Sequence, residues 1–511
     1  MLRLRLWLGW LGVPLMLAAS CSSDDAQKTS PAPVSGSGGD LAGAASDDGG
    51  SATQGGTTTA TGGTEAGGQG SGGEGTSALT DGWSSGTRLR AVLDVAGDAK
   101  RFRLWHDAEL DVDCSFTPAA DGVERCMPIV EHGYAVYSDA KCTKAVGVFG
   151  IDDPIPPYLA EPYRARECAT GASFLEVGAA VTGVTDVFSN SSGSCSPNGT
   201  VSATQVVKQL GPAAAPAKFV AQAKITREPR DLRLEANVRV AEDGSREVIG
   251  FFDLERKTDC KPISRNPEYA CVPDNLAFIE VFFADDKCKM QAAYYPGCDG
   301  TPNIILDSAP SNTGQYFEVG DLLTTPPLFR KDSTVCQPYT DTTEPNAKYY
   351  APGKEVPWSD FAELTATDEG SGRIAVTALR GASDELLARI DFFDTELSTH
   401  CGVAEAADGK TRCLPSSIGS VNVFSDAACT SALFENQAGS PLPDGLAFLT
   451  ANAPGGGTAV FKLGPKLATP AKTWQLGGLD CQERSVSAGA DYYSSTPIPP
   501  SGLALVTREV E

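Results

Sequence analysis

The stretch Phe393-Asp394-Thr395-Glu396-Leu397, followed by Cys401, decides the fold because its pattern occurs three times in the chain. Each copy has an aromatic residue shortly before an Asp, a Glu two positions after it and a cysteine seven positions after it. The other two copies are 105–110 with Cys114 and 252–256 with Cys260. The three Asp residues are Asp107, Asp253 and Asp394, so the repeat spacing is 146 and then 141 residues. A unit of this size is large enough to bury a hydrophobic core of its own.

The match between the copies continues beyond this stretch. A second cysteine stands two positions before a proline, a third follows an Asp by three positions, and a fourth lies 16 or 17 residues after a glycine. These are Cys126, Cys271 and Cys413; Cys142, Cys288 and Cys429; and Cys195, Cys336 and Cys481. The Asp residues before the third cysteines, Asp139, Asp285 and Asp426, are expected to cap a short turn. So many ordered coincidences identify three homologous copies.

Local patterns within the copies indicate β-structure. In residues 232–240, Leu232, Leu234, Ala236, Val238 and Val240 alternate with polar residues, which is typical of a strand with one buried face. Asp121-Gly122 and Asp408-Gly409 predict hairpin turns between the first and second cysteines. No run of twelve or more residues has a helical period. The sequence therefore predicts an all-β protein of three tandem, homologous small antiparallel domains, each a sandwich or barrel.

The N-terminal part has a different composition. Arg3 and Arg5 precede a short apolar run that ends at Ala-Ala-Ser-Cys21, which predicts a lipoprotein signal peptide over residues 1–20 and acylation of Cys21. Residues 21–82 are rich in Gly, Ser and Thr and predict a disordered tether. The expected β repeats are then 83–226, 227–368 and 369–511. Ordinary cleavage without lipid is the alternative for Cys21.

This combination of lipobox, tether and cysteine repeats resembles uncharacterised cell-surface lipoproteins of myxobacteria over the whole chain. The resemblance implies a cell-surface location and a repeat structure, and it carries no activity. Copy two departs from the pattern because Arg265-Asn266-Pro267 replaces the Asp-Gly turn and no Arg precedes its second cysteine. The expected location is the cell envelope, specifically the outer membrane, with the lipid as the contact to the membrane and an exposure to an oxidising compartment.

Fourteen cysteines remain after Cys21, an even number that favours disulfides in an exported chain. If the four shared cysteines pair alike in every copy, a hairpin favours the first with the second, and the third then pairs with the fourth. The expected bonds are 114–126, 142–195, 260–271, 288–336, 401–413 and 429–481. Cys168 and Cys298 have no counterparts and are left to bond each other or to stay free. Pairing of a third cysteine with one of these two is the main alternative.

The shared acids are the candidates for chemistry: Asp107, Glu109, Asp253, Glu255, Asp394 and Glu396. Two carboxylates two positions apart on a strand project to the same face. Three roles are open to such a pair: a structural turn, a Ca²⁺ site, or the acid and base of glycoside hydrolysis. Their presence in all three copies favours the structural role, with calcium as the weaker possibility. We expect no other cofactor and assign no catalytic residue. The three histidines occupy different repeat positions, which disfavours a histidine-assisted nucleophile.

The charge narrows the classes of partner. With 41 Lys and Arg against 65 Asp and Glu in 511 residues, the net charge is −24. Such a chain lacks the basic surface that nucleic-acid binding requires. Two hypotheses remain: a non-enzymatic surface module for binding, adhesion or envelope structure, whose partner is an extracellular glycan or protein, and a secreted hydrolase that uses carboxylates.

Overall fold

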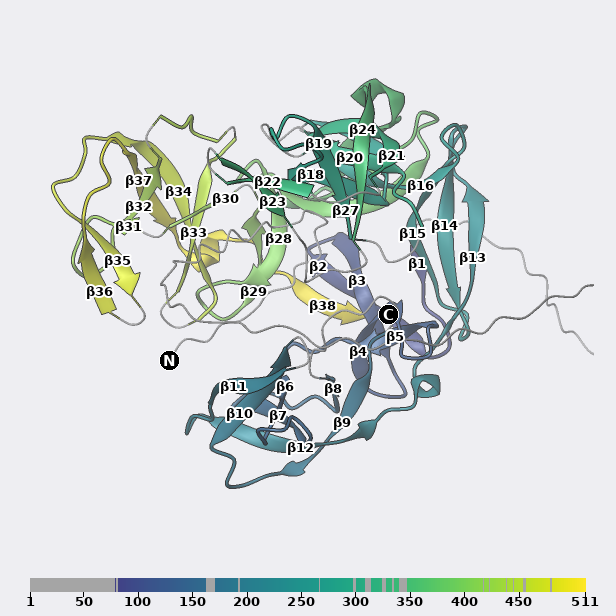
Figure 1. The fold of residues 1–511 in the computed structure, drawn as a ribbon, viewed down its shortest axis with the longest axis horizontal. Coiled ribbons are helices and arrows are strands. Elements are labelled where there is room, and N and C mark those ends of the chain that lie inside the picture. The colour runs from purple at the N-terminus through teal and green to yellow at the C-terminus, as the bar shows by residue number, and fades with distance from the viewer. Residues whose placement is uncertain are drawn as a thin grey trace, which may run out of the picture. The chain divides into compact units, whose positions relative to one another are not determined.

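The computed structural model describes most of the chain after residue 78. The described residues are 79, 81–161, 171–191, 194–265, 267–296, 300–307, 314–323, 328–332, 335–339, 347–416, 418–421, 423–437, 439–443, 445–453, 456–477 and 480–511. They form β-strands and three 3-10 helices, and this described part contains no α-helix (Figure 1). The predicted all-β fold is confirmed. The expected signal peptide lies outside the described residues, as does the expected tether except for a few residues at its C-terminal end.

Each copy begins with an antiparallel meander of four strands. Copy one contributes β2 (Leu89–Ala96), β3 (Ala99–Asp107), β4 (Val112–Pro118) and β5 (Glu124–Pro128). Copy two contributes β14 (Leu234–Ala241), β15 (Arg246–Asp253), β16 (Thr258–Arg265) and β17 (Glu268–Pro273). Copy three contributes β26 (Ile374–Arg380), β27 (Leu386–Asp394), β28 (Thr399–Glu405) and β29 (Thr411–Pro415). The Asp of the repeat ends the second strand and lies opposite the first residue of the first strand in every copy.

The strand that pairs with the first strand of each meander comes from another copy. After the 3-10 helix η1 (Pro216–Lys218), β13 (Gln222–Pro229) pairs with β14 of copy two. After η2 (Trp358–Asp360), β25 (Ala362–Glu369) pairs with both β17 and β26. After η3 (Pro500–Gly502), the C-terminal strand β38 (Thr507–Val510) pairs with β2 (Figure 1). The end of the chain therefore completes copy one.

A second sheet follows each meander. Copy one has β6 (Tyr134–Tyr137), β7 (Ala145–Gly150), β8 (Tyr158–Ala160), β9 (Phe174–Ala180), β10 (Asp186–Ser191), β11 (Ser194–Thr200) and β12 (Gln205–Ala213). Copy two has β18 (Leu276–Phe283), β19 (Gln291–Tyr295), β20 (Ile304–Asp307), β21 (Gln315–Leu322), β22 (Leu328–Asp332), β23 (Val335–Tyr339) and β24 (Lys348–Val356). Copy three has β30 (Ile418–Ser420), β31 (Val423–Phe424), β32 (Ala432–Asn436), β33 (Phe448–Asn452), β34 (Thr458–Leu467), β35 (Thr473–Gly477), β36 (Asp480–Arg484) and β37 (Asp491–Ile498). Most pairs are antiparallel, and β18–β20 and β30–β33 are parallel.

The hydrophobic cores of the meanders are shared between copies. Leu234 and Phe251 of copy two pack in one cluster with Leu379 and Leu387 of copy three. Two further clusters join copy one to its neighbours. In one cluster, Ala241 of copy two packs with Leu89 and Trp105 of copy one. In the other, Ala96 and Ala99 of copy one pack with Ile374 and Phe392 of copy three. The meanders therefore do not bury their apolar faces alone.

Two details differ from the simplest interpretation of the sequence. The expected boundaries after residues 226 and 368 both fall inside a strand, β13 and β25, and that strand pairs with the following copy. Leu232 does not belong to the buried face of its strand, because β14 begins at Leu234 and the Leu232 side chain is 90% exposed. The short strand β1 (Trp83–Ser84) pairs with β15 of copy two.

Candidate functional site

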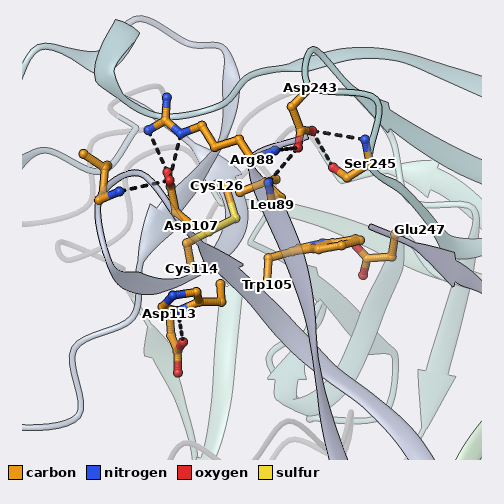
Figure 2. Close-up of a disulfide and its surroundings, with 12 residues drawn as sticks. Arg88, Leu89, Trp105, Asp107, Asp113, Cys114, Cys126, Asp243, Ser245 and Glu247 are labelled. Atoms are coloured by element: carbon orange, nitrogen blue, oxygen red, sulfur yellow. Dashed lines mark hydrogen bonds and ion pairs between the residues drawn. A yellow bond between two sulfur atoms is a disulfide. The ribbon is translucent and has the colours of Figure 1, made fainter. Parts of the chain in front are cut away.

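The first shared Asp is held by an arginine beside the first disulfide (Figure 2). Arg88 donates from Nε to Asp107 Oδ1 and from Nη2 to Oδ2, both at 2.7 Å. The backbone N–H groups of Glu109 and Leu110 also donate to Oδ1. The Asp107 side chain is fully buried, so these donors replace the water that a carboxylate loses on burial. Arg88 Nη2 also donates to the carbonyl of Lys218, the last residue of η1, at 2.7 Å.

The same arrangement occurs in the other two copies. Arg233 binds Asp253 and the carbonyl of Asp360, and Arg373 binds Asp394 and the carbonyl of Gly502. Asp360 and Gly502 are the last residues of η2 and η3. Each arginine thus joins the beginning of a copy to its end, and we call this group the arginine clamp. The arginines directly precede the first strand of each meander, a signal that sequence reasoning missed.

The second acid of each pair contacts the same arginine from outside. Glu109, Glu255 and Glu396 lie 3.0 Å from Nη1 of their arginines, with side chains 65–69% exposed. The acid pairs proposed for calcium or catalysis are therefore bonded to a guanidinium in all three copies. Within the described residues, no group of three or more His, Cys, Asp or Glu side chains is placed to hold a metal ion. The geometry is that of a structural clamp.

In copy two the clamp lowers the pKa of its carboxylate. Burial by itself raises the pKa of Asp253, but the hydrogen bonds from Arg233 and from the N–H groups of Arg256 and Glu255 outweigh it and lower the pKa. The bonds to Asp253 in turn raise the pKa of Arg233. The pair is therefore ionised throughout the neutral range and is unsuited to proton transfer there.

The structure contains the six disulfides that the sequence analysis expects, and they form two groups. The first group, 114–126, 260–271 and 401–413, crosses the third and fourth strands of each meander. Its cysteines are at most 1% exposed and belong to the cores shared between copies. This group fixes the meander beside the arginine clamp.

The second group, 142–195, 288–336 and 429–481, is half-buried. Each bond joins a turn in the second sheet to the last strand of a hairpin: β10–β11, β22–β23 or β35–β36. These hairpins pair through their backbones with the remaining strands of their sheets at only one or two residue positions. Their side chains also pack against those sheets, and the disulfide adds a covalent attachment.

The turns that carry these disulfides are capped by the shared aspartates, as predicted. Asp426 accepts hydrogen bonds from the N–H groups of Ala428, Thr430 and Ser431. Burial raises its pKa, but these bonds outweigh that effect and lower the pKa to about 2. Asp139 and Asp285 occupy the same place in copies one and two. The third cysteine of each copy lies in this turn and has a positive φ near 50°, which the tight turn requires.

Further aspartates connect one copy to another. The carboxylate of Asp243, in the β14–β15 turn, accepts bonds from the N–H groups of Arg88 and Leu89 in copy one (Figure 2). Asp98, in the β2–β3 turn, accepts a 2.8 Å bond from the hydroxyl of Ser371 in copy three. Asp231 of copy two accepts from the N–H of Ala382 in copy three. Every pair of copies is therefore joined by an aspartate.

Two half-buried acids at the same interfaces have raised pKa values. Burial raises the pKa of Glu247, although Arg239 and the indole N–H of Trp105, at 3.1 Å, stabilise its charge. Burial also raises the pKa of Asp391, which faces Arg101 of copy one at 3.3 Å. Both groups are engaged by residues of a neighbouring copy, so they serve the contact between copies.

One cleft of about 350 Å³ lies where the first and third copies meet the ends of the described chain. We call it the junction cleft. Trp83, Lys100 and Arg389 line it together with the acids Asp81, Asp98, Glu369 and Glu511. These residues are far apart in sequence and have no repeated pattern, so sequence reasoning gave no signal for the cleft. Aromatic, basic and acidic side chains converge here.

Three cysteines of the sequence analysis lie outside the described residues: Cys21, Cys168 and Cys298. No helix in the described part of the chain is long and apolar enough to cross a membrane. The six disulfides indicate an oxidising, extracellular environment.

Comparison with known proteins agrees with the repeat. No curated protein and no solved structure matches the chain. One family model matches twice, over residues 73–337 and 303–511, and together the two matches cover the β-structure. Two matches of one model along one chain are what tandem homologous copies produce. The chain therefore belongs to the Family of unknown function (DUF7481).

Proposed function

We propose that this protein is a non-enzymatic binding module of the cell envelope, held at the outer membrane by lipid on Cys21. The described domain is extracellular in character because it carries six disulfides. The lipid and the tether are expectations from the sequence. An acylated Cys21 would hold the module off the membrane by a Gly/Ser/Thr-rich segment.

The observation that carries the non-enzymatic role is the use of the shared acids. In each copy the buried Asp accepts hydrogen bonds from an arginine and from two backbone N–H groups, so its carboxylate is already engaged in a structural ion pair. Hydrolysis of a glycoside instead needs one protonated and one ionised carboxyl group on either side of a bond. The repeated acids therefore support folding, and binding is left to surfaces that the copies form together.

The experiment combines two measurements on the mature protein. Mass spectrometry of the N-terminal peptide should find Cys21 as the first residue and acylated. Pull-down with envelope polysaccharide and envelope protein fractions should show saturable binding without release of reducing ends. Residues 1–20 retained, or an unmodified Cys21, would overturn the anchor. Release of reducing ends that stops in an Asp253→Asn variant whose near-ultraviolet circular dichroism matches the wild type would support the hydrolase hypothesis instead.

A further inference from the structure

The junction cleft is the place where the chain concentrates binding chemistry outside its repeated framework. Its walls come from the segment before β2, from the β2–β3 turn, from β25 to β27 and from the C-terminal residue. The volume of about 350 Å³ is at the lower end of ligand-binding pockets. Because it needs both ends of the described domain and two of the copies, this combination occurs once among the residues that the structure describes.

The charges in the cleft are compensated. Arg389 binds Asp81 and lies 4.0 Å from Glu369, and Lys100 Nζ lies 3.1 Å from Glu511. A bond from the hydroxyl of Ser371 lowers the pKa of Asp98 and keeps it ionised. The cleft thus offers N–H donors and carboxylate acceptors side by side. Its four acids outnumber its two basic residues, which disfavours an anionic ligand.

An aromatic ring completes the lining. Trp83 is half-buried, its strand β1 pairs with β15, and its ring stacks on Phe102 with centroids 5.7 Å apart. The stacking and the strand pairing hold the indole in one position. An indole offers a flat apolar surface and one N–H donor, which suits a ligand with an apolar face and polar edges.

We propose that the junction cleft binds a neutral saccharide unit, an inference that rests on the proposed binding function. Sugar hydroxyls donate and accept hydrogen bonds, so they match a wall on which donors and acceptors alternate. The C–H face of a pyranose packs on the Trp83 ring. A cationic ligand gains less here because the carboxylates already have basic or hydroxyl partners. An anionic sugar is repelled by the excess of acids.

The test uses the mature full-length protein on a glycan array with matched neutral, amino and uronic-acid sugars, followed by calorimetry. We expect binding to neutral glycans, at least tenfold weaker in Trp83→Ala. Trp474→Ala is the matched control, since Trp474 is a half-buried tryptophan of copy three that does not line the cleft. Asp98→Asn and Glu511→Gln change exposed side chains and should each weaken binding at least threefold without loss of the fold.

The outcomes separate this inference from the broader function. Absence of neutral-glycan binding, preference for amino or uronic-acid sugars, or unchanged affinity in both Asp98→Asn and Glu511→Gln would overturn it. If the wild-type protein binds envelope fractions and Trp83→Ala binds them equally well, the binding module stands and the junction cleft is wrong. If neither protein binds envelope fractions, the proposed function itself fails.

Discussion

Replacing Arg233 with methionine tests whether the arginine clamp supports the fold. The change keeps the aliphatic part of the side chain but removes the three bonds to Asp253 and the bond to the carbonyl of Asp360. It leaves the carboxylate of Asp253 in a site with no exposed surface. Breaking a buried ion pair by removing one partner costs about 3–5 kcal/mol. Because the Arg233 side chain is 23% exposed, water offsets part of this loss, and we expect ~2–4 kcal/mol.

The matched control is Glu255→Gln, which removes the exposed acid from the same guanidinium. A pair with one exposed partner contributes roughly 0–1 kcal/mol, so this variant should be nearly as stable as the wild type. Arg233→Lys should restore little, because a lysine lacks the planar pair of donors that both Asp253 oxygens use. The assay is urea unfolding of the oxidised protein, followed by near-ultraviolet circular dichroism. Equal losses in Arg233→Met and Glu255→Gln would refute the reasoning.

The same variant has an expected pH signature. The folded-state pKa of Asp253 is lowered, so its contribution to stability is present above the unfolded-state pKa of about 3.9 and is lost as the pH falls through the lower folded value. Without Arg233 the remaining burial raises that pKa. The wild type should therefore lose stability as the pH falls below about 4. In Arg233→Met the contribution of Asp253 has the opposite sign, because protonation of an unpaired buried carboxyl favours the folded state. The difference in stability between wild type and variant should therefore narrow as the pH falls.

Three further predictions follow from the framework. Mild reduction with a small dithiol should open the half-buried 142–195, 288–336 and 429–481 bonds before the buried hairpin bonds, as differential alkylation would record; simultaneous reduction would contradict the two-group assignment. Deletion of 507–511 should expose the edge of β2, so that hydrogen exchange rises in residues 89–96 and stays unchanged in β14; equal protection of β2 would show that β38 is dispensable. Asp426→Ala should speed hydrogen exchange of the Ser431 amide at neutral pH, because the turn at 426–431 loses its cap. In the wild type this amide should stay protected until the pH approaches about 2, where Asp426 is protonated. Loss of its protection well above that pH would contradict the capping role.

Much of the local structure was predictable because it depends on neighbours in sequence. The Asp-Gly dipeptides at 121–122 and 408–409 form turns in which the glycine has a positive φ of 74–75°. The hairpin disulfides were accessible for the same reason, since a turn of about a dozen residues brings its cysteines together. The turn caps needed only an Asp three positions before a cysteine. Strand alternation predicted the buried face of β14 but not its first residue, because Leu232 precedes the pairing with β15.

Contacts between copies had no such local signal. The pairing of β38 with β2 joins residues more than 400 positions apart, and nothing in Thr507–Val510 specifies that partner. The sequence analysis missed Arg88, Arg233 and Arg373, because their role depends on 3-10 helices about 130 residues away. The junction cleft likewise exists only after both ends of the domain are placed. The sequence by itself determined the repeat, the β class and the local turns and hairpins, because these are set by residue period and short-range geometry. The tertiary structure decided which copy supplies the strand beside each meander and where the junction cleft forms. Both depend on long-range packing of apolar faces that no single copy buries alone.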